Sequence, residues 1–166
     1  MFYKLIQAID KNFSLPEAKA HCDIPCGIYD PTPAQIDALT VVRMMDLMAA
    51  VADSDDKGDL SYRNTLARYI TVKEQHAEKA KHEIRVIWGD FIKDPHVEKY
   101  PVLPELVHKI MQIGSKCKQT AEREQGLAFV DAINQFAEIF WAIKEVKTKK
   151  AKAPYAPALE MVYPDL

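Results

Sequence analysis

A histidine and two cysteines lie close together near the start of the chain, in the segment HCDIPCGIYD. His21, Cys22 and Cys26 fall within six positions. Pro25 disfavours a helical conformation at the residue before it, and Gly27 frees the backbone to turn sharply. We therefore expect a hook, which can aim one imidazole and two sulfurs at the same point.

Several kinds of chemistry could use these groups. A zinc site needs four tetrahedral ligands, and no second cysteine pair completes the set. A thioredoxin-like couple uses two intervening residues in a βαβ unit, whereas Cys22 and Cys26 have three residues between them and no such unit around them. From the residues alone, both a metal site and cysteines that are clustered by chance stay open.

The residues before the hook resemble a removable leader. The sequence Ala18-Lys19-Ala20 imitates the small-x-small site of a signal peptidase, but the apolar run that ends at Ile9 is followed at once by Asp10. That run is shorter than the apolar core of about 7 to 15 residues in a secretory signal. We expect residues 1–20 to be an amphipathic leader that is removed in the cytoplasm; the alternative is an ordinary first helix.

Cleavage between Ala20 and His21 would change the chemistry of the hook. It would free an α-amine on His21, next to the amide nitrogen of Cys22, within chelating reach of a metal held by the two thiolates. Two nitrogens and two sulfurs in a plane suit nickel(II) or copper(II) rather than zinc. The His21 imidazole could then be an axial fifth ligand.

Composition limits the partners and the compartment. The chain has 166 residues, a net charge of −2 and three cysteines, which suits one domain in a reducing compartment. This charge argues against binding to nucleic acid or to a membrane surface, both of which need a concentrated basic face. We therefore predict a cytoplasmic protein with neither partner, and we interpret the basic run Lys147 to Lys152 as a solvated helix end.

Hydrophobic periodicity predicts four helices. Apolar residues recur at helical spacing over about 33–51, 60–91, 103–117 and 121–146. In the first of these segments Thr32 and Gln35 form a capping-box pattern. We expect an all-α fold, an antiparallel up-and-down four-helix bundle with an N-terminal metal-binding hook, that spans residues 21–166 as one domain.

Other segments have weaker patterns. We predict a loop in KDPHVEKYP, an extended surface tail from Pro154, and no strand of useful length. Cys117 continues the apolar stripe of the third helix and is predicted to be buried. Lys73 is predicted to lie on the solvated face of the second helix.

The hook resembles that of the nickel superoxide dismutases, whose mature chain begins H-C-x-x-P-C-G-x-Y. The resemblance continues through KEQHAEKAKHEIRVIWGDFIKDPHVEKYPVL and fades after roughly Lys109. It implies that nickel, one ion per subunit, is bound by His21, Cys22 and Cys26. It also implies a cycle between nickel(II) and nickel(III) that converts superoxide to oxygen and hydrogen peroxide.

The resemblance assigns expected roles to further residues. Tyr29 matches the hook tyrosine that screens or orients the substrate over the open face of the metal, and Asp23 matches an aspartate that braces the loop. The alternatives are a packing aromatic and a solvated turn residue. Phe91 occupies a position where family members can carry a second tyrosine.

A carboxylate and a basic residue are expected to orient the axial imidazole. Asp37 occupies the position of a family glutamate, and His76 the position of an arginine, so we expect either a shorter pair or a different tuning of the ligand. Arg68 also matches a family arginine and could supply positive charge. Lys93 matches a lysine that could steer superoxide inward; the alternative is an ordinary surface lysine.

The resemblance implies a homohexamer and a dedicated maturation protease. A nickel- or copper-binding carrier or storage protein without turnover is the alternative function. A di-iron carboxylate site would need two Glu-x-x-His motifs and two more carboxylates. Only Glu105 and His108 have that spacing.

Overall fold

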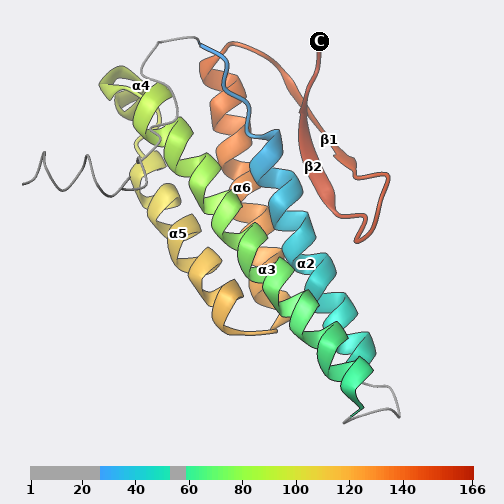
Figure 1. Cartoon of the computed structure of the whole chain (residues 1–166). Helices are drawn as coiled ribbons and strands as arrows, with labels where there is room; N and C mark the ends of the chain where they lie inside the picture. The colour runs from blue at the N-terminus through green and yellow to red at the C-terminus, as the bar shows by residue number, and fades with distance from the viewer. Residues whose placement is uncertain (1–26, 53–58) are drawn as a thin grey trace, which may run out of the picture.

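The computed structural model describes residues 27–52 and 59–166. The described residues form four long helices. A π-helical turn and a short helix connect the second long helix to the third, and a two-stranded hairpin follows the fourth (Figure 1). The elements are α2 (Thr32–Ala52), α3 (Leu60–Val86), η1 (Ile87–Phe91), α4 (Asp94–Lys99), α5 (Leu103–Gln119), α6 (Arg123–Ile143), β1 (Thr148–Lys152) and β2 (Glu160–Pro164).

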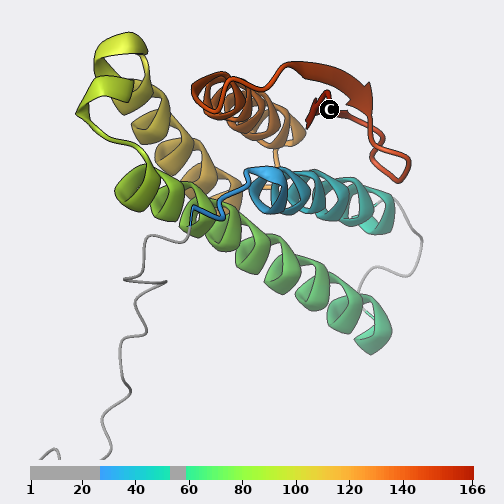
Figure 2. The ribbon, with the colours of Figure 1, turned by 90° about the horizontal axis from the view of Figure 1, so that it is seen from above.

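The long helices form the predicted all-α bundle. Helix α2 packs against α3 and α6, and α5 packs against the same two helices. Buried residues of these helices form one core cluster. Viewed from above, the hairpin lies outside α2 and α6 (Figure 2). The four helix positions are therefore confirmed, with boundaries shifted by a few residues.

Aromatic residues of α6 fill the centre of the bundle. Phe129, Phe136 and Phe140 are at most 1% exposed, and each such side chain stabilises the fold by about 2 to 3 kcal/mol. Helix α6 is long and apolar enough to cross a membrane by length and composition alone. Because its inward residues form this core, packing accounts for its apolar character.

Close approach between α2 and α6 depends on one glycine. A Cβ atom added at Gly126 would lie 2.9 Å from Val42 Cγ2 and 3.0 Å from Met45 Sδ. The missing side chain lets the two helices pack tightly in this region. This contact helps to hold α2, which follows the hook directly.

Three predictions about the connecting segments are wrong: a loop in KDPHVEKYP, a helix end in the basic run, and the absence of strands of useful length. The predicted loop KDPHVEKYP contains α4, in which Pro95 occupies the first turn. The basic run is not a helix end, because it contains strand β1, which pairs antiparallel with β2. The side chains of β1 are almost all exposed, so no alternation of apolar and polar residues marked it as a strand.

The C-terminal tail is a strand with a buried centre, rather than an extended surface segment. Met161 and Val162 are at most 1% exposed. Gln35 donates from Nε2 to Val162 O over 3.0 Å and accepts from Val162 N over 2.7 Å. Because its amide is used in this way, Gln35 makes no capping box with Thr32, whose own amide donates to Asp30 Oδ1.

Lys73 is a further correction. Its side chain was expected in solvent but the residue is 2% exposed. Nζ donates to Lys118 O over 3.0 Å and to Thr120 O over 2.5 Å, at the C-terminal end of α5. A lysine there satisfies carbonyls that have no partner within their own helix and matches the negative end of the helix dipole.

Candidate metal centre

The predicted nickel ligands lie outside the described residues. His21, Cys22 and Cys26, with the bracing residue Asp23, precede Gly27, where the described chain begins. Within residues 27–52 and 59–166, no group of three His, Cys, Asp or Glu side chains could hold a metal ion. The described residues include Gly27, where the hook joins the bundle, and the side chains around it.

Gly27 has a backbone conformation that permits a turn. Its φ of +71° lies in the left-handed region that favours glycine. Its carbonyl oxygen accepts a hydrogen bond from Lys144 Nζ over 3.3 Å. The residue after Cys26 is thus tied to the end of α6, 117 positions away in the sequence.

An aromatic wall stands beside this turn. The ring centroid of Tyr29 is 5.5 Å from that of Phe91, at the end of η1. Phe91 also lies 5.1 Å from Phe140 and 5.6 Å from His96, centroid to centroid. The half-buried Tyr29 therefore packs on the residue that takes the place of a second tyrosine, so a ring without a hydroxyl stands at this position.

Asp37 and His76 form the pair that the sequence left open. His76 Nδ1 donates to Asp37 Oδ1 over 2.5 Å, between the second turn of α2 and the middle of α3. The side chains are 26% exposed for His76 and 13% for Asp37. Partial burial limits competition from water, so the hydrogen bond fixes both side chains.

Arg68 lies away from this pair. It precedes His76 by eight residues, about 12 Å along the helix, and is exposed beside Asn64 and Thr71. None of the ion pairs among the described residues joins Arg68 to Asp37. In this structure the carboxylate is held by His76 instead.

Lys93 lies at the same end of the bundle as the aromatic wall. It is exposed, two residues after Phe91, and immediately precedes α4. Its amide donates to His96 Nδ1 over 3.1 Å. The backbone at Lys93 is therefore fixed, while Lys93 itself is exposed to solvent.

This end of the bundle suits the predicted donor set. The buried indole Nε1 of Trp141 has no hydrogen-bond partner among the described residues, one turn before the Lys144 ammonium. An unpaired buried donor and a cation both favour nearby acceptors such as backbone carbonyls and anionic sulfur. An amine, an imidazole and two thiolates, in turn, are ligands that nickel accepts.

Cys117 contributes nothing to such a site. It is buried, as predicted, and desolvation raises the pKa of its thiol to about 11. The thiolate is the form that binds metals and reacts with electrophiles. A neutral, enclosed thiol is therefore a packing group.

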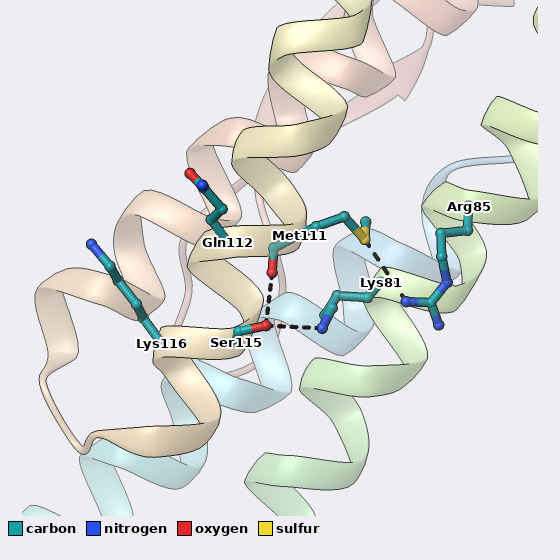
Figure 3. Close-up of a pocket in the computed structure, with 6 residues that line it drawn as sticks. All are labelled: Lys81, Arg85, Met111, Gln112, Ser115 and Lys116. Atoms are coloured by element: carbon teal, nitrogen blue, oxygen red, sulfur yellow. Dashed lines mark hydrogen bonds between the residues drawn. The ribbon is translucent and has the colours of Figure 1, made fainter.

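A second feature is a pocket of about 600 Å³ between α3 and α5, shown in Figure 3. Lys81 spans it, donating from Nζ to Ser115 Oγ over 3.0 Å. Arg85 and Lys81 both face Glu78. The Arg85 hydrogen bond is the main reason that the pKa of Glu78 falls to about 2, so this carboxylate balances part of the positive charge around the pocket.

Comparison with known proteins identifies the family. A sequence model described as nickel-containing superoxide dismutase matches residues 16–144. The chain belongs to the nickel-containing superoxide dismutase family. The curated nickel superoxide dismutase of Streptomyces seoulensis is 39% identical over 129 residues, which cover 78% of this chain and 92% of that protein.

Two further relatives agree. The nickel superoxide dismutase of Streptomyces coelicolor is 40% identical over 126 residues, 76% of this chain and 89% of that protein. A native nickel superoxide dismutase structure aligns with a TM-score of 0.66 at 40% identity, covering 75% of this chain and 99% of that one. This chain is thus a nickel-dependent superoxide dismutase, an oxidoreductase, with nickel as its cofactor.

The family match also corrects the extent of the resemblance. The match to the family continues to residue 144, whereas the sequence analysis predicts that the resemblance fades after roughly Lys109. The matched region ends at Lys144, the residue that contacts Gly27. The hairpin of β1 and β2 lies beyond it.

Proposed function

We propose that His21, Cys22 and Cys26 bind nickel after cleavage between Ala20 and His21, and that the loaded chain disproportionates superoxide. Two superoxide ions and two protons give one molecule of oxygen and one of hydrogen peroxide. The observation that carries the proposal is an intact HCDIPCGIY hook inside a family match over residues 16–144. Nickel supplies the one-electron chemistry by alternating between its +2 and +3 states.

The chain's own residues make this chemistry available. Cleavage frees the His21 amine, and two anionic thiolates with strong nitrogen donors stabilise the higher oxidation state. Thiolates are themselves oxidisable, so the site must limit the access of peroxide. The ring contact with Phe91 holds Tyr29 in place and supports a role for Tyr29 in screening the metal that the hook would hold.

The pair of Asp37 and His76 is proposed to orient the imidazole of His21, which would help to hold nickel. Metal-bound histidines are commonly fixed by a hydrogen bond from their second nitrogen to a carboxylate. The 2.5 Å bond from His76 supports this role, because it holds the Asp37 carboxylate in one orientation. Asp23 is proposed to brace the hook, and Lys93 to attract the superoxide anion.

Maturation and assembly complete the proposal. We infer that residues 1–20 are a leader removed by a dedicated protease, that the protein acts in the cytoplasm, and that it assembles as a homohexamer. Ile28 and Val102 are 82% and 51% exposed, and apolar side chains so exposed are suited to subunit contacts. The molar mass of the trimmed, nickel-loaded protein in solution tests the hexamer.

The decisive experiment compares the chain that starts at His21 with the full chain from Met1. Nickel content and the decay of a superoxide pulse are measured for both, and we expect one nickel per chain and rapid decay only after trimming. The double variant C22S/C26S should lose both properties, whereas C117A, a matched thiol control, should keep them.

Three results would contradict parts of this proposal. Equal activity of the untrimmed chain would remove the need for a free His21 amine. Activity in C22S/C26S would exclude the two sulfurs as ligands. Tight nickel binding without superoxide decay would favour the carrier or storage function.

A further inference from the structure

Lys144 joins three parts of the bundle that are distant in sequence. It follows the last residue of α6, and its Nζ donates to Gly27 O over 3.3 Å. The same ammonium lies 5.4 Å from the centroid of the Phe91 ring and 5.6 Å from that of Phe140. One cation thus contacts the turn after the hook, the end of η1 and the end of α6.

The two rings restrict where this ammonium can lie. Phe91 and Phe140 are 5.1 Å apart at their centroids, with planes at 51°. A cation over aromatic faces is attracted by the negative charge density of the rings. Both ring contacts therefore help to hold Nζ at the position from which it bonds to Gly27.

The bonded carbonyl belongs to the peptide that leaves Gly27. The positive φ of Gly27 makes the chain turn at this point, and no atom lies within 4 Å of a Cβ added there. Among the described residues, the space where a Gly27 side chain would lie is open, and Lys144 supplies a polar contact to this peptide. Fixing that peptide fixes the chain immediately after Gly27, one residue beyond the predicted ligand Cys26.

We propose that Lys144 is a positioning residue. It anchors Gly27, at the C-terminal side of the nickel hook, to the Phe91 and Phe140 rings of the aromatic wall. This inference rests on the proposed function, because it assigns Lys144 its role through the predicted ligand Cys26. The Phe91 ring presents its apolar face to the Lys144 ammonium. The lysine, in turn, directs its proton to a backbone carbonyl.

The first test needs no metal. Backbone order parameters of residues 27–30 are measured by nitrogen-15 relaxation in the full chain for wild type, K144M and K144R. The Lys144 hydrogen bond holds the Gly27 carbonyl, so we expect order parameters below about 0.6 in K144M and of about 0.85 in wild type and K144R. Unchanged order parameters in K144M would overturn the proposal.

A matched control is available at Lys99. Its Nζ lies 5.5 Å from the centroid of the Tyr100 ring, so K99M removes a lysine that also lies over an aromatic ring but is not recorded as bonded to Gly27. K99M should leave residues 27–30 unchanged. If K144M does not fold, as judged by circular dichroism, K144Q is measured instead with the same expected result.

The second test uses the trimmed, nickel-loaded protein. The rate of nickel transfer to a chelator should rise about tenfold in K144M, and K144R should restore most of the retention. The electron paramagnetic resonance signal of oxidised nickel should shift in K144M but not in K99M. Identical release rates and spectra in wild type and K144M would refute the role of Lys144.

The two proposals can fail separately. If the trimmed wild-type chain binds no nickel, the proposed function fails, and with it the role of Lys144 at a hook. If wild type binds nickel and removes superoxide while K144M behaves identically in order parameters, release and spectrum, only the Lys144 proposal fails.

Discussion

The hydrogen bond between Asp37 and His76 should contribute measurably to stability and to the metal site. It is 2.5 Å long, and its side chains are 13% and 26% exposed. Hydrogen bonds to charged groups contribute about 1.5 to 3 kcal/mol, and solvent at the partly exposed His76 reduces this to about 1 to 2 kcal/mol. For a chain of 166 residues, such a loss lowers the melting temperature by about 3 to 6 °C.

A double-mutant cycle isolates the pair. The free energies of unfolding of metal-free wild type, D37A, H76A and D37A/H76A are measured by urea denaturation at neutral pH. We expect a coupling energy of about 1 to 2 kcal/mol, as found for residues in direct contact. Additive losses would show that the two side chains are energetically independent, and would refute the reasoning.

The same variants test the functional role. Removal of a carboxylate that orients a metal-bound histidine costs about 10-fold to 100-fold in metal affinity or activity, so D37A should lose nickel affinity to this extent. The matched variant D37E/H76R introduces the glutamate and arginine expected from the family resemblance. It should recover most of the affinity, and full affinity in D37A would separate the pair from the metal.

Three further predictions concern stability. K73M removes a buried donor from two carbonyls at the end of α5 and should cost about 2 to 3 kcal/mol in urea unfolding, whereas K79M, at an exposed lysine of the same helix, should change little. Glu78 has a pKa lowered from 4.5 to about 2, so its contribution is present above pH 4.5 and is lost as the pH falls towards 2. The Glu78 side chain is 44% exposed, so solvent screens its ion pairs. The melting temperatures of wild type and E78Q should therefore differ by only about 1 to 2 °C at pH 7 and converge near pH 2; a constant difference would contradict this. Q35L leaves both backbone groups of Val162 without the partner they have in wild type, and faster hydrogen exchange at the Val162 amide is the expected result.

Patterns within short stretches of sequence predicted the long helices, the hook and the buried position of Cys117. Apolar spacing marked the long helices because one face of each helix enters the core. The hook was visible in the sequence because its histidine, cysteines, proline and glycine lie within a few positions. Cys117 was placed correctly, since it continues a regular apolar stripe.

Contacts between distant segments could not be predicted in this way. Lys73 has the charge of a surface residue, and only the position of α5 makes it a buried donor. Lys144 lies in a lysine-rich stretch without a distinguishing signal, and its partner Gly27 is at the other end of the described chain. Strand β1 has no alternation because the bundle covers hardly any of its side chains.

The hairpin contacts helix α2, which carries Asp37 of the proposed metal centre. Gln35 and Asp37 are two residues apart, so their side chains leave the helix about 200° apart. Gln35 bonds to the backbone of β2, and Asp37 bonds to His76 of α3. The start of α2 is therefore held on opposite sides, and one of these contacts comes from residues beyond the family match at 144. Because Asp37 is the shorter carboxylate at its position, a helix fixed in this way can keep that carboxylate within reach of His76 without the longer side chains of the family pattern.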